Sequence, residues 1–194
     1  MVGLLSDIPH FKEVVIMATV CEQCGHRSNE AKSATGVSDQ GVRLSLSLQD
    51  ADDLRRDVLK SETCSVRIPE LELEGGMGTV SGRFTTVEGL LMAIRNQLGD
   101  ESALILGDSG VPEKKGRITD FLCQLDEAVA LKRRVTLILD DPAGNSFVQS
   151  LTDVAVDERL SVEFYDRSFE QNDELGLNDM RTENYEASEN LTAS

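Results

Sequence analysis

The chain has 194 residues, of which 40% are hydrophobic, and this length and composition predict one sizeable core with a small appendage. Its 35 acidic residues outnumber 19 basic ones and give a net charge of −16, which repels nucleic acids and anionic membranes and favours a basic or mixed protein partner. No apolar run reaches about 18 residues, no basic segment precedes one and only four cysteines occur, so we expect no transmembrane helix, no signal peptide and a location in the cytoplasm or nucleus.

The first predicted element is the apolar run Val14–Ala18, which predicts a strand leading into Cys21-Glu22-Gln23-Cys24-Gly25. Two thiolates two residues apart suit a tetrahedral zinc ion, since the turn between them aims both sulfurs at one point. A structural site needs a second pair, and Cys64 and Cys123 are single and distant, so the motif is half of a zinc knuckle. A redox pair or two incidental thiols is the alternative interpretation.

Two histidines flank this motif. His10 and His26 could each supply a further zinc ligand, but an ordinary surface or hydrogen-bonded histidine is the competing interpretation of both. The polar residues from Arg27 to Gly41 have the composition of a loop.

A β region follows. Apolar residues alternate from Val42 to Leu48 and predict a half-buried strand. Further strands are predicted around Val58-Leu59, from Cys64 to Ile68, and from Leu71 to Gly75, with Pro69 marking a strand end.

The spacing of the apolar residues then becomes that of a helix. Thr85-Thr86-Val87-Glu88 reads as a capping box, and apolar residues at helical spacing predict a helix that ends before Gly99. A loop from Gly107 to Gly116 and a second helical pattern from Ile118 to Val129 predict a helical hairpin.

The last third returns to strands, at Val135–Leu139 and Leu160–Phe164. Between them Asp140 and Asp141 could bind a hard cation or act in acid/base chemistry, but turn chemistry alone also explains Asp-Pro-x-Gly. From Asp166 the chain is acidic, with scattered apolar residues that could dock on the body or on a partner. They are Phe169, Leu175, Leu177, Met180 and Tyr185.

Six strings of residues, spread over most of the chain, form a specific set. They are Ile8–Glu13, Cys21–Arg27, Leu59–Val66, Phe84–Leu91, Asp140–Ser146 and Asn172–Met180. Together they resemble the eukaryotic Zpr family of zinc-finger proteins, whose members carry two tandem repeats of a four-cysteine zinc ribbon and a β domain with an inserted helical hairpin. This chain is similar to the second repeat, and the family's first Cys-x-x-Cys would stand shortly before the position of Met1.

The resemblance implies a mainly β fold with an α insertion: a partial zinc ribbon followed by a β-sandwich or double-stranded β-helix-like domain with an inserted helical hairpin. We expect the zinc-ribbon segment to span residues 1–41, the β domain 42–168 with the hairpin at 85–132, and the acidic tail 169–194. Cys21 and Cys24 match the family's second ligand pair, and Cys64 matches a position that is not a ligand.

The resemblance also implies a chaperone or adaptor for translation elongation factor 1-alpha that shuttles between cytoplasm and nucleus, with links to receptor tyrosine kinases or other signalling proteins. The acidic charge is the reason to expect no nucleic-acid or membrane partner. Within this chain we expect the contact segment to be Asn172–Met180, through Leu175, Leu177 and Met180.

Two other classes of function compete with the chaperone or adaptor role. The first is an enzyme on the β domain, which we do not expect because His10, His26, Asp140 and Asp141 do not assemble into a metal or nucleophile cluster. The second is a fragment without a function of its own, left by a truncated gene or transcript.

Overall fold

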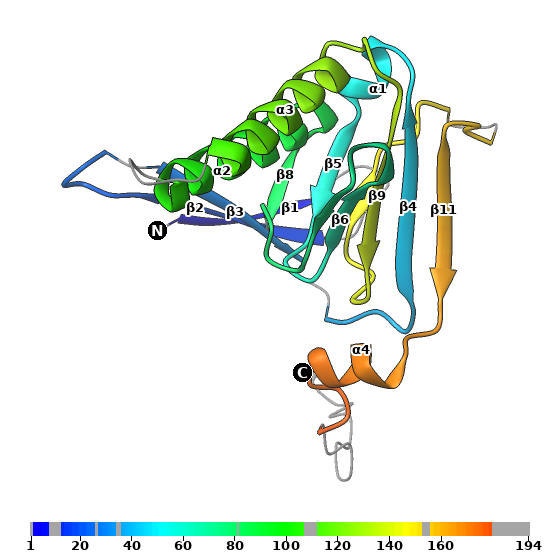
Figure 1. Cartoon of the computed structure of the whole chain (residues 1–194). Helices are drawn as coiled ribbons and strands as arrows, with labels where there is room; N and C mark the ends of the chain where they lie inside the picture. Colours follow the sequence, from blue (N-terminus) through cyan, green and yellow to red (C-terminus); the bar gives the residue numbers. More distant parts are fainter. Residues whose placement is uncertain are drawn as a thin grey trace, which may run out of the picture.

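The computed structural model describes residues 2–7, 13–25, 27–33, 36–80, 82–106, 112–152 and 156–179. It begins with an antiparallel sheet of three strands, β1 (Val2–Asp7), β2 (Glu13–Val20) and β3 (Arg27–Ser33), with β2 in the middle (Figure 1). The strand predicted before the cysteines is confirmed as β2.

The loop predicted from Arg27 to Gly41 is wrong over its first half, where β3 forms. β3 is polar except for Ala31, and its strand conformation comes from pairing with β2 in a register that runs from Val20 opposite Arg27 to Val14 opposite Ser33. Pairing with a neighbouring strand outweighs the loop-like composition, because strand formation depends more on cross-strand partners than on intrinsic preference.

Two further sheets make up the β domain. The five-stranded sheet has the order β11-β4-β9-β6-β7, and the three-stranded sheet has the order β10-β5-β8. The strands are β4 (Gly41–Leu48), β5 (Asp57–Lys60), β6 (Ser65–Ile68), β7 (Leu73–Gly75), β8 (Arg83–Thr86), β9 (Val135–Asp141), β10 (Phe147–Val148) and β11 (Leu160–Tyr165). The mainly β fold with an inserted helical hairpin is therefore confirmed.

The hairpin consists of α2 (Val87–Leu106) and α3 (Pro112–Val129), which lie side by side across one side of the β domain (Figure 1). The predicted capping box is displaced by one residue, because Thr86 Oγ1 accepts the Gly89 N–H at 3.2 Å. Gly99 does not end α2, since a single glycine costs a helix only about 1 kcal/mol and the helix continues for seven residues beyond it. Pro112 starts α3 four residues before the predicted end of the loop.

One hydrophobic core unites the strands before and after the hairpin with the helices themselves. Leu46 and Leu137 come from the large sheet and Leu91 and Leu125 from the hairpin, and each side chain is at most 1% exposed. Cys64 belongs to this core, and burial raises the pKa of its thiol to about 12, so it is a packing residue. Three short helical segments complete the fold: α1 (Ala51–Arg55), the 3-10 turn η1 (Pro69–Leu71) that begins at the predicted strand end, and α4 (Phe169–Glu174).

Candidate functional site

The turn between β2 and β3 carries Cys21 and Cys24 at the surface. The Gly25 N–H donates to the Cys21 carbonyl oxygen at 2.8 Å, and Gly25 adopts a φ of +71°, the left-handed conformation that favours glycine. Hydrogen bonds from the Cys24 N–H, the Cys24 side chain and the Gln23 N–H lower the pKa of the Cys21 thiol. These donors favour the thiolate, which is the form that binds metals.

This turn fits half of a tetrahedral zinc site. Two thiolates on one knuckle are a suitable ligand pair, and a structural site takes four ligands. Among the residues that the structure describes, no group of three or more His, Cys, Asp and Glu side chains could hold a metal ion. His10 and His26, the candidate further ligands, lie outside the described residues.

We therefore expect this chain, on its own, to hold zinc weakly or by sharing ligands with a second copy. Metal analysis after dialysis against a mild chelator, combined with sedimentation, measures both possibilities. The variants Cys21→Ser and Cys24→Ser should abolish zinc binding, whereas Cys123→Ser, which changes an exposed thiol on α3, should leave it unchanged.

One zinc ion held tightly by each monomer would contradict this expectation. The variants His10→Ala and His26→Ala would then show whether a histidine supplies a missing ligand.

Asp141, at the end of β9, is fully buried and accepts five hydrogen bonds. Three come from the hydroxyl groups of Ser61 (2.8 Å), Thr63 (2.6 Å) and Ser146 (2.7 Å). The other two come from the N–H groups of Ala143 (3.0 Å) and Asn145 (2.9 Å). The carboxylate thus fixes both the turn after β9 and the segment that leads into β6.

Asp140 points to the opposite face of the sheet, because successive residues of a strand alternate. Its carboxylate accepts from Arg43 Nη2 at 2.9 Å and from the Tyr165 hydroxyl at 2.6 Å. The two aspartates therefore do not converge on one ion. Turn chemistry, the simpler interpretation of this motif, explains Asp141.

The same turn anchors the linker that joins β3 to β4. The Ser38 N–H donates to the Ala143 carbonyl at 2.9 Å, and Asn145 Nδ2 donates to the Gly36 carbonyl at 3.3 Å. Gly144, at a φ of +69°, lies so close that an added Cβ would stand 2.5 Å from the Gln40 carbonyl oxygen. Asp141 therefore organises the junction between the N-terminal sheet, whose β2–β3 turn carries the cysteines, and the five-stranded sheet, which contributes to the core.

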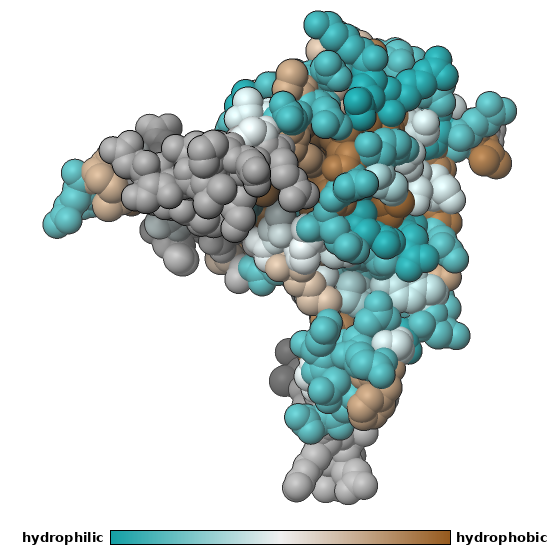
Figure 2. Space-filling model, in the orientation of Figure 1, coloured by the Kyte–Doolittle hydropathy of each residue, from teal (hydrophilic) through white to brown (hydrophobic). Residues whose placement is uncertain are grey.

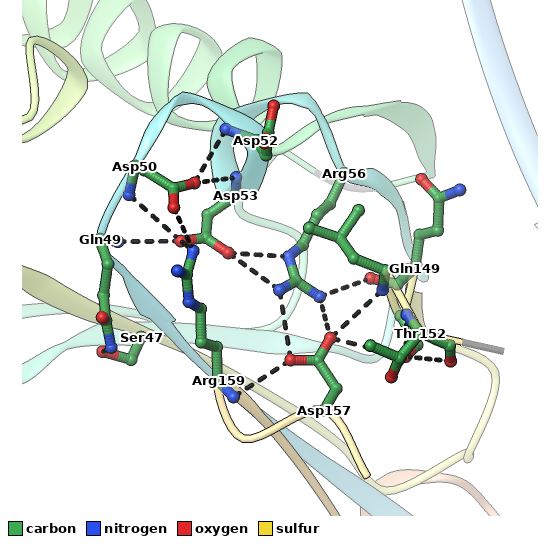
Figure 3. Close-up of polar contacts among 12 residues, drawn as sticks. Ser47, Gln49, Asp50, Asp52, Asp53, Arg56, Gln149, Thr152, Asp157 and Arg159 are labelled. Atoms are coloured by element: carbon green, nitrogen blue, oxygen red, sulfur yellow. Dashed lines mark hydrogen bonds and ion pairs between the residues drawn. The ribbon is translucent and has the colours of Figure 1, made fainter. Parts of the chain in front are cut away.

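A second polar cluster, which the sequence did not single out, joins α1 to the segment before β11 (Figure 3). Arg56 is buried and donates to Asp53 Oδ1 through Nη2 at 2.9 Å, to the Gln149 carbonyl at 3.0 Å and to Asp157. Arg159 Nη1 donates to Asp53 Oδ2 at 2.8 Å. We refer to Asp53, Arg56, Asp157 and Arg159 as the arginine cluster.

The predicted contact segment follows β11. Arg167 Nη1 donates to the carbonyls of Ser38 (2.7 Å) and Pro142 (3.0 Å), which ties the start of α4 to the β domain. Leu175 and Leu177 follow α4 and are half-buried, while Met180 lies outside the described residues. Whether these residues bind a partner stays a prediction.

Comparison with known proteins identifies both parts of the chain. Residues 3–39 match the ZPR1 zinc-finger domain, and residues 52–177 match the ZPR1 jelly-roll domain. The two-sheet architecture described above is thus that of a jelly roll, and membership of a zinc-finger family implies zinc binding.

Curated relatives agree over nearly the whole chain. It is 55% identical over 184 residues to zinc finger protein ZPR1 of Drosophila melanogaster and 52% identical over 183 residues to that of Homo sapiens. It is 49% identical over 182 residues to the zinc finger chaperone zpr1 of Schizosaccharomyces pombe. Each match covers 94% of this chain and 40% of the relative, so the chain spans about two fifths of the relatives' length. From its two domain matches, the chain belongs to the ZPR1 family of zinc-finger proteins.

Proposed function

We propose that this chain is a protein-binding module that takes part in a chaperone or adaptor function for translation elongation factor 1-alpha. The observation that carries the proposal is family membership, which includes a relative from Schizosaccharomyces pombe named as a zinc finger chaperone. The net charge of −16 supports a partner with a basic surface, because charge complementarity accelerates association. The Drosophila, human and fission yeast relatives are named as zinc finger proteins or a chaperone, which favours binding over catalysis.

The contact surface that we propose is α4 with the residues after it. Glu170, Asp173 and Glu174 are exposed on this segment. The Leu177 N–H donates to the Asn172 carbonyl at 2.8 Å, so the chain turns back on α4 and holds Leu175 and Leu177 close to the charged residues. Such a surface suits a basic partner, with charge steering association and apolar contacts slowing dissociation. Met180 completes the proposed set.

The partners and location follow from the same proposal. We propose action in both cytoplasm and nucleus, with receptor tyrosine kinases or other signalling proteins as further partners, and without nucleic-acid or membrane binding. The acidic charge supports these exclusions, and no described helix is long and apolar enough to cross a bilayer.

The double variant Leu175→Ala/Leu177→Ala tests the contact segment. We expect weaker capture of purified elongation factor 1-alpha with little change in melting temperature, because both side chains are only half-buried. Affinity measured by biolayer interferometry and thermal melting measured on the same preparations give the two readouts.

Leu73→Ala is a suitable control, because it removes a half-buried leucine from β7, on the opposite edge of the large sheet from β11. A lower melting temperature with unchanged affinity in the double variant would show that Leu175 and Leu177 pack within the chain instead. If removal of residues 170–194 also left affinity unchanged, the segment would be ruled out.

A further inference from the structure

The last strand of the large sheet, β11, leaves apolar side chains uncovered. Val162 is 50% exposed and Phe164 is 65% exposed, although their β4 partners Leu44 and Val42 are 4% and 3% exposed. All four side chains lie on the face of the sheet that covers the core, because the registered pairs share one face. The layer that covers the core therefore reaches Leu160, which is 8% exposed, and leaves Val162 and Phe164 farther along β11 uncovered. Figure 1 shows β11 in orange at the edge of the sheet.

The backbone of β11 also offers hydrogen bonds along its outer edge, away from β4. The Ser47 N–H donates to the Arg159 carbonyl at 2.9 Å, which sets the phase of the antiparallel ladder. The backbone groups of alternate residues bond to the neighbouring strand. The N–H and C=O groups of Ser161 and Glu163 therefore point to β4, while those of Val162 and Phe164 point outward. The Leu160 N–H agrees with this phase, since it donates to the Asp157 carbonyl rather than to β4.

No strand in the described part of the chain pairs with this outer edge, where β11 stands first in the order of the sheet. Proteins usually blunt such edges with proline, a bulge or inward-pointing charges. The exposed Val162 and Phe164 do the reverse, because they add apolar contact beside free backbone groups.

The segment that contains β11 is acidic. Between residues 157 and 179 there are eight carboxylates and two arginines. Both arginines are engaged within the chain, Arg159 with Asp50 and Asp53 and Arg167 with backbone carbonyls. Glu163 lies on the face opposite Val162 and Phe164, where its side chain is 60% exposed and pairs with Arg43 Nη1 at 3.4 Å. Figure 2 shows separate hydrophobic patches within a largely hydrophilic surface.

We propose that the outer edge of β11 binds an extended segment of a partner protein, in which apolar side chains alternate with lysine or arginine, as an added strand. The apolar side chains of that segment pack on Val162 and Phe164, and its cations face Glu163. Backbone hydrogen bonds to Val162 and Phe164 fix the register, which is the established way in which an open sheet edge recognises a peptide.

A second copy of this chain fits the edge less well. Pairing two β11 strands would bring two acidic surfaces together in a chain of net charge −16, and like charges on paired strands are destabilising. The proposal goes beyond the proposed function, since strand addition to β11 does not depend on which protein supplies the segment or on the residues after α4.

Amide hydrogen exchange on the whole chain tests the proposal directly. The probe is a capped synthetic peptide of four Lys-Val repeats, and a peptide of four Glu-Val repeats is its matched control. We expect the Lys-Val peptide to slow exchange at Val162 and Phe164, whose N–H groups gain partners, and to leave Ser161 and Glu163 unchanged because β4 already protects them. The Glu-Val peptide should have no effect. Binding without selective protection of Val162 and Phe164 would overturn the proposal.

A pair of matched variants gives an independent readout by fluorescence anisotropy. Val162→Lys places a cation on the docking face and should weaken binding of the Lys-Val peptide about tenfold or more, whereas Val156→Lys adds the same charge at an 89% exposed valine outside β11 and should leave affinity within about twofold of the original. Melting curves check that both variants fold. Equal losses of affinity in the two variants would mean nonspecific charge attraction and would overturn the proposal. A concentration-dependent dimer that Val162→Lys abolishes would also overturn it. Because the probe contains no elongation factor, its failure would leave the proposed function standing.

Discussion

Replacing Arg56 with methionine is expected to lower the free energy of unfolding by about 3 to 5 kcal/mol, because it leaves two buried carboxylates without the cation that they share. The Arg56 side chain is 1% exposed, and the carboxylates of Asp53 and Asp157 are 0% and 9% exposed. Methionine fills a similar volume, so the loss reports the charge interaction rather than a cavity. Urea unfolding followed by circular dichroism measures the change.

Arg55→Met is the matched control. Arg55 is the neighbouring residue and also pairs with an aspartate, Asp52, at 3.5 Å, but both side chains are more than two thirds exposed. Exposed pairs of this spacing contribute about 0.5 kcal/mol or less, so Arg55→Met should hardly change the urea midpoint. Equal effects of the two substitutions would mean that burial of the arginine cluster adds nothing to stability.

The pH dependence of stability provides a second check on the same cluster. The Arg56 guanidinium lowers the pKa of Asp157 from its ordinary 3.8 to about 2, with smaller contributions from the N–H groups of Arg159 and Leu151. Because the folded-state pKa lies below the unfolded one, this stabilisation is complete above about pH 4 and is lost as the pH falls towards 2. The shift corresponds to about 2 kcal/mol, so the gap between the original chain and Arg56→Met should narrow by that order over the same interval.

The strands of the core were predictable because burial alternates along them. β4 and β9 each bury every second residue over their length, and that period is visible in the sequence. β3 carries no such signal, since all its residues but Ala31 are polar and its pairing with β2 determines its conformation. Sequence periodicity reports burial, so it does not reveal a strand whose conformation comes from pairing with a neighbouring strand.

The arginine cluster was hidden for a different reason. Arg55 and Arg56 are identical neighbours in the sequence, yet Arg55 is exposed, whereas Arg56 is buried between the nearby Asp53 and Asp157, which lies 101 residues away. The local signal that could have been used is the Asp50-x-x-Asp53 spacing, because these two residues form the capping box that starts α1. Distant pairing of charges leaves no mark in a single sequence.

The resemblance to the family, in contrast, rested partly on residues whose roles the structure explains. The strings Leu59–Val66 and Asp140–Ser146 are far apart in the sequence but meet at Asp141, where Ser61 and Ser146 donate to the same carboxylate oxygen. Only two of the four zinc ligands are defined, because the sequence and the described structure supply the same two thiolates, Cys21 and Cys24.

Replacing Asp141 with asparagine should lower the free energy of unfolding by about 2 to 3 kcal/mol, although the two side chains have the same shape. Oδ1 accepts the Ala143 N–H and Oδ2 accepts the Asn145 N–H, so an amide in either orientation turns its NH2 group towards one of these two buried donors. The hydroxyl groups around the carboxylate can rotate to accept a hydrogen bond, but a backbone N–H cannot. Thermal and urea unfolding measure the loss.

Asp140→Asn is the control for this prediction, because it makes the same chemical change one residue earlier in the sequence and on the other face of the sheet. Asp140 is 16% exposed and pairs with Arg43, whose side chain is 37% exposed, so its loss should cost about 1 kcal/mol or less.

Magnesium or calcium at millimolar concentration should not raise the melting temperature of the original chain, since all five donors to Asp141 already occupy its two oxygens. A cation-dependent rise that Asp141→Asn abolishes would instead favour the hard-cation interpretation of the aspartate pair, and an effect of Asp141→Asn no larger than that of Asp140→Asn would remove Asp141 from its organising role.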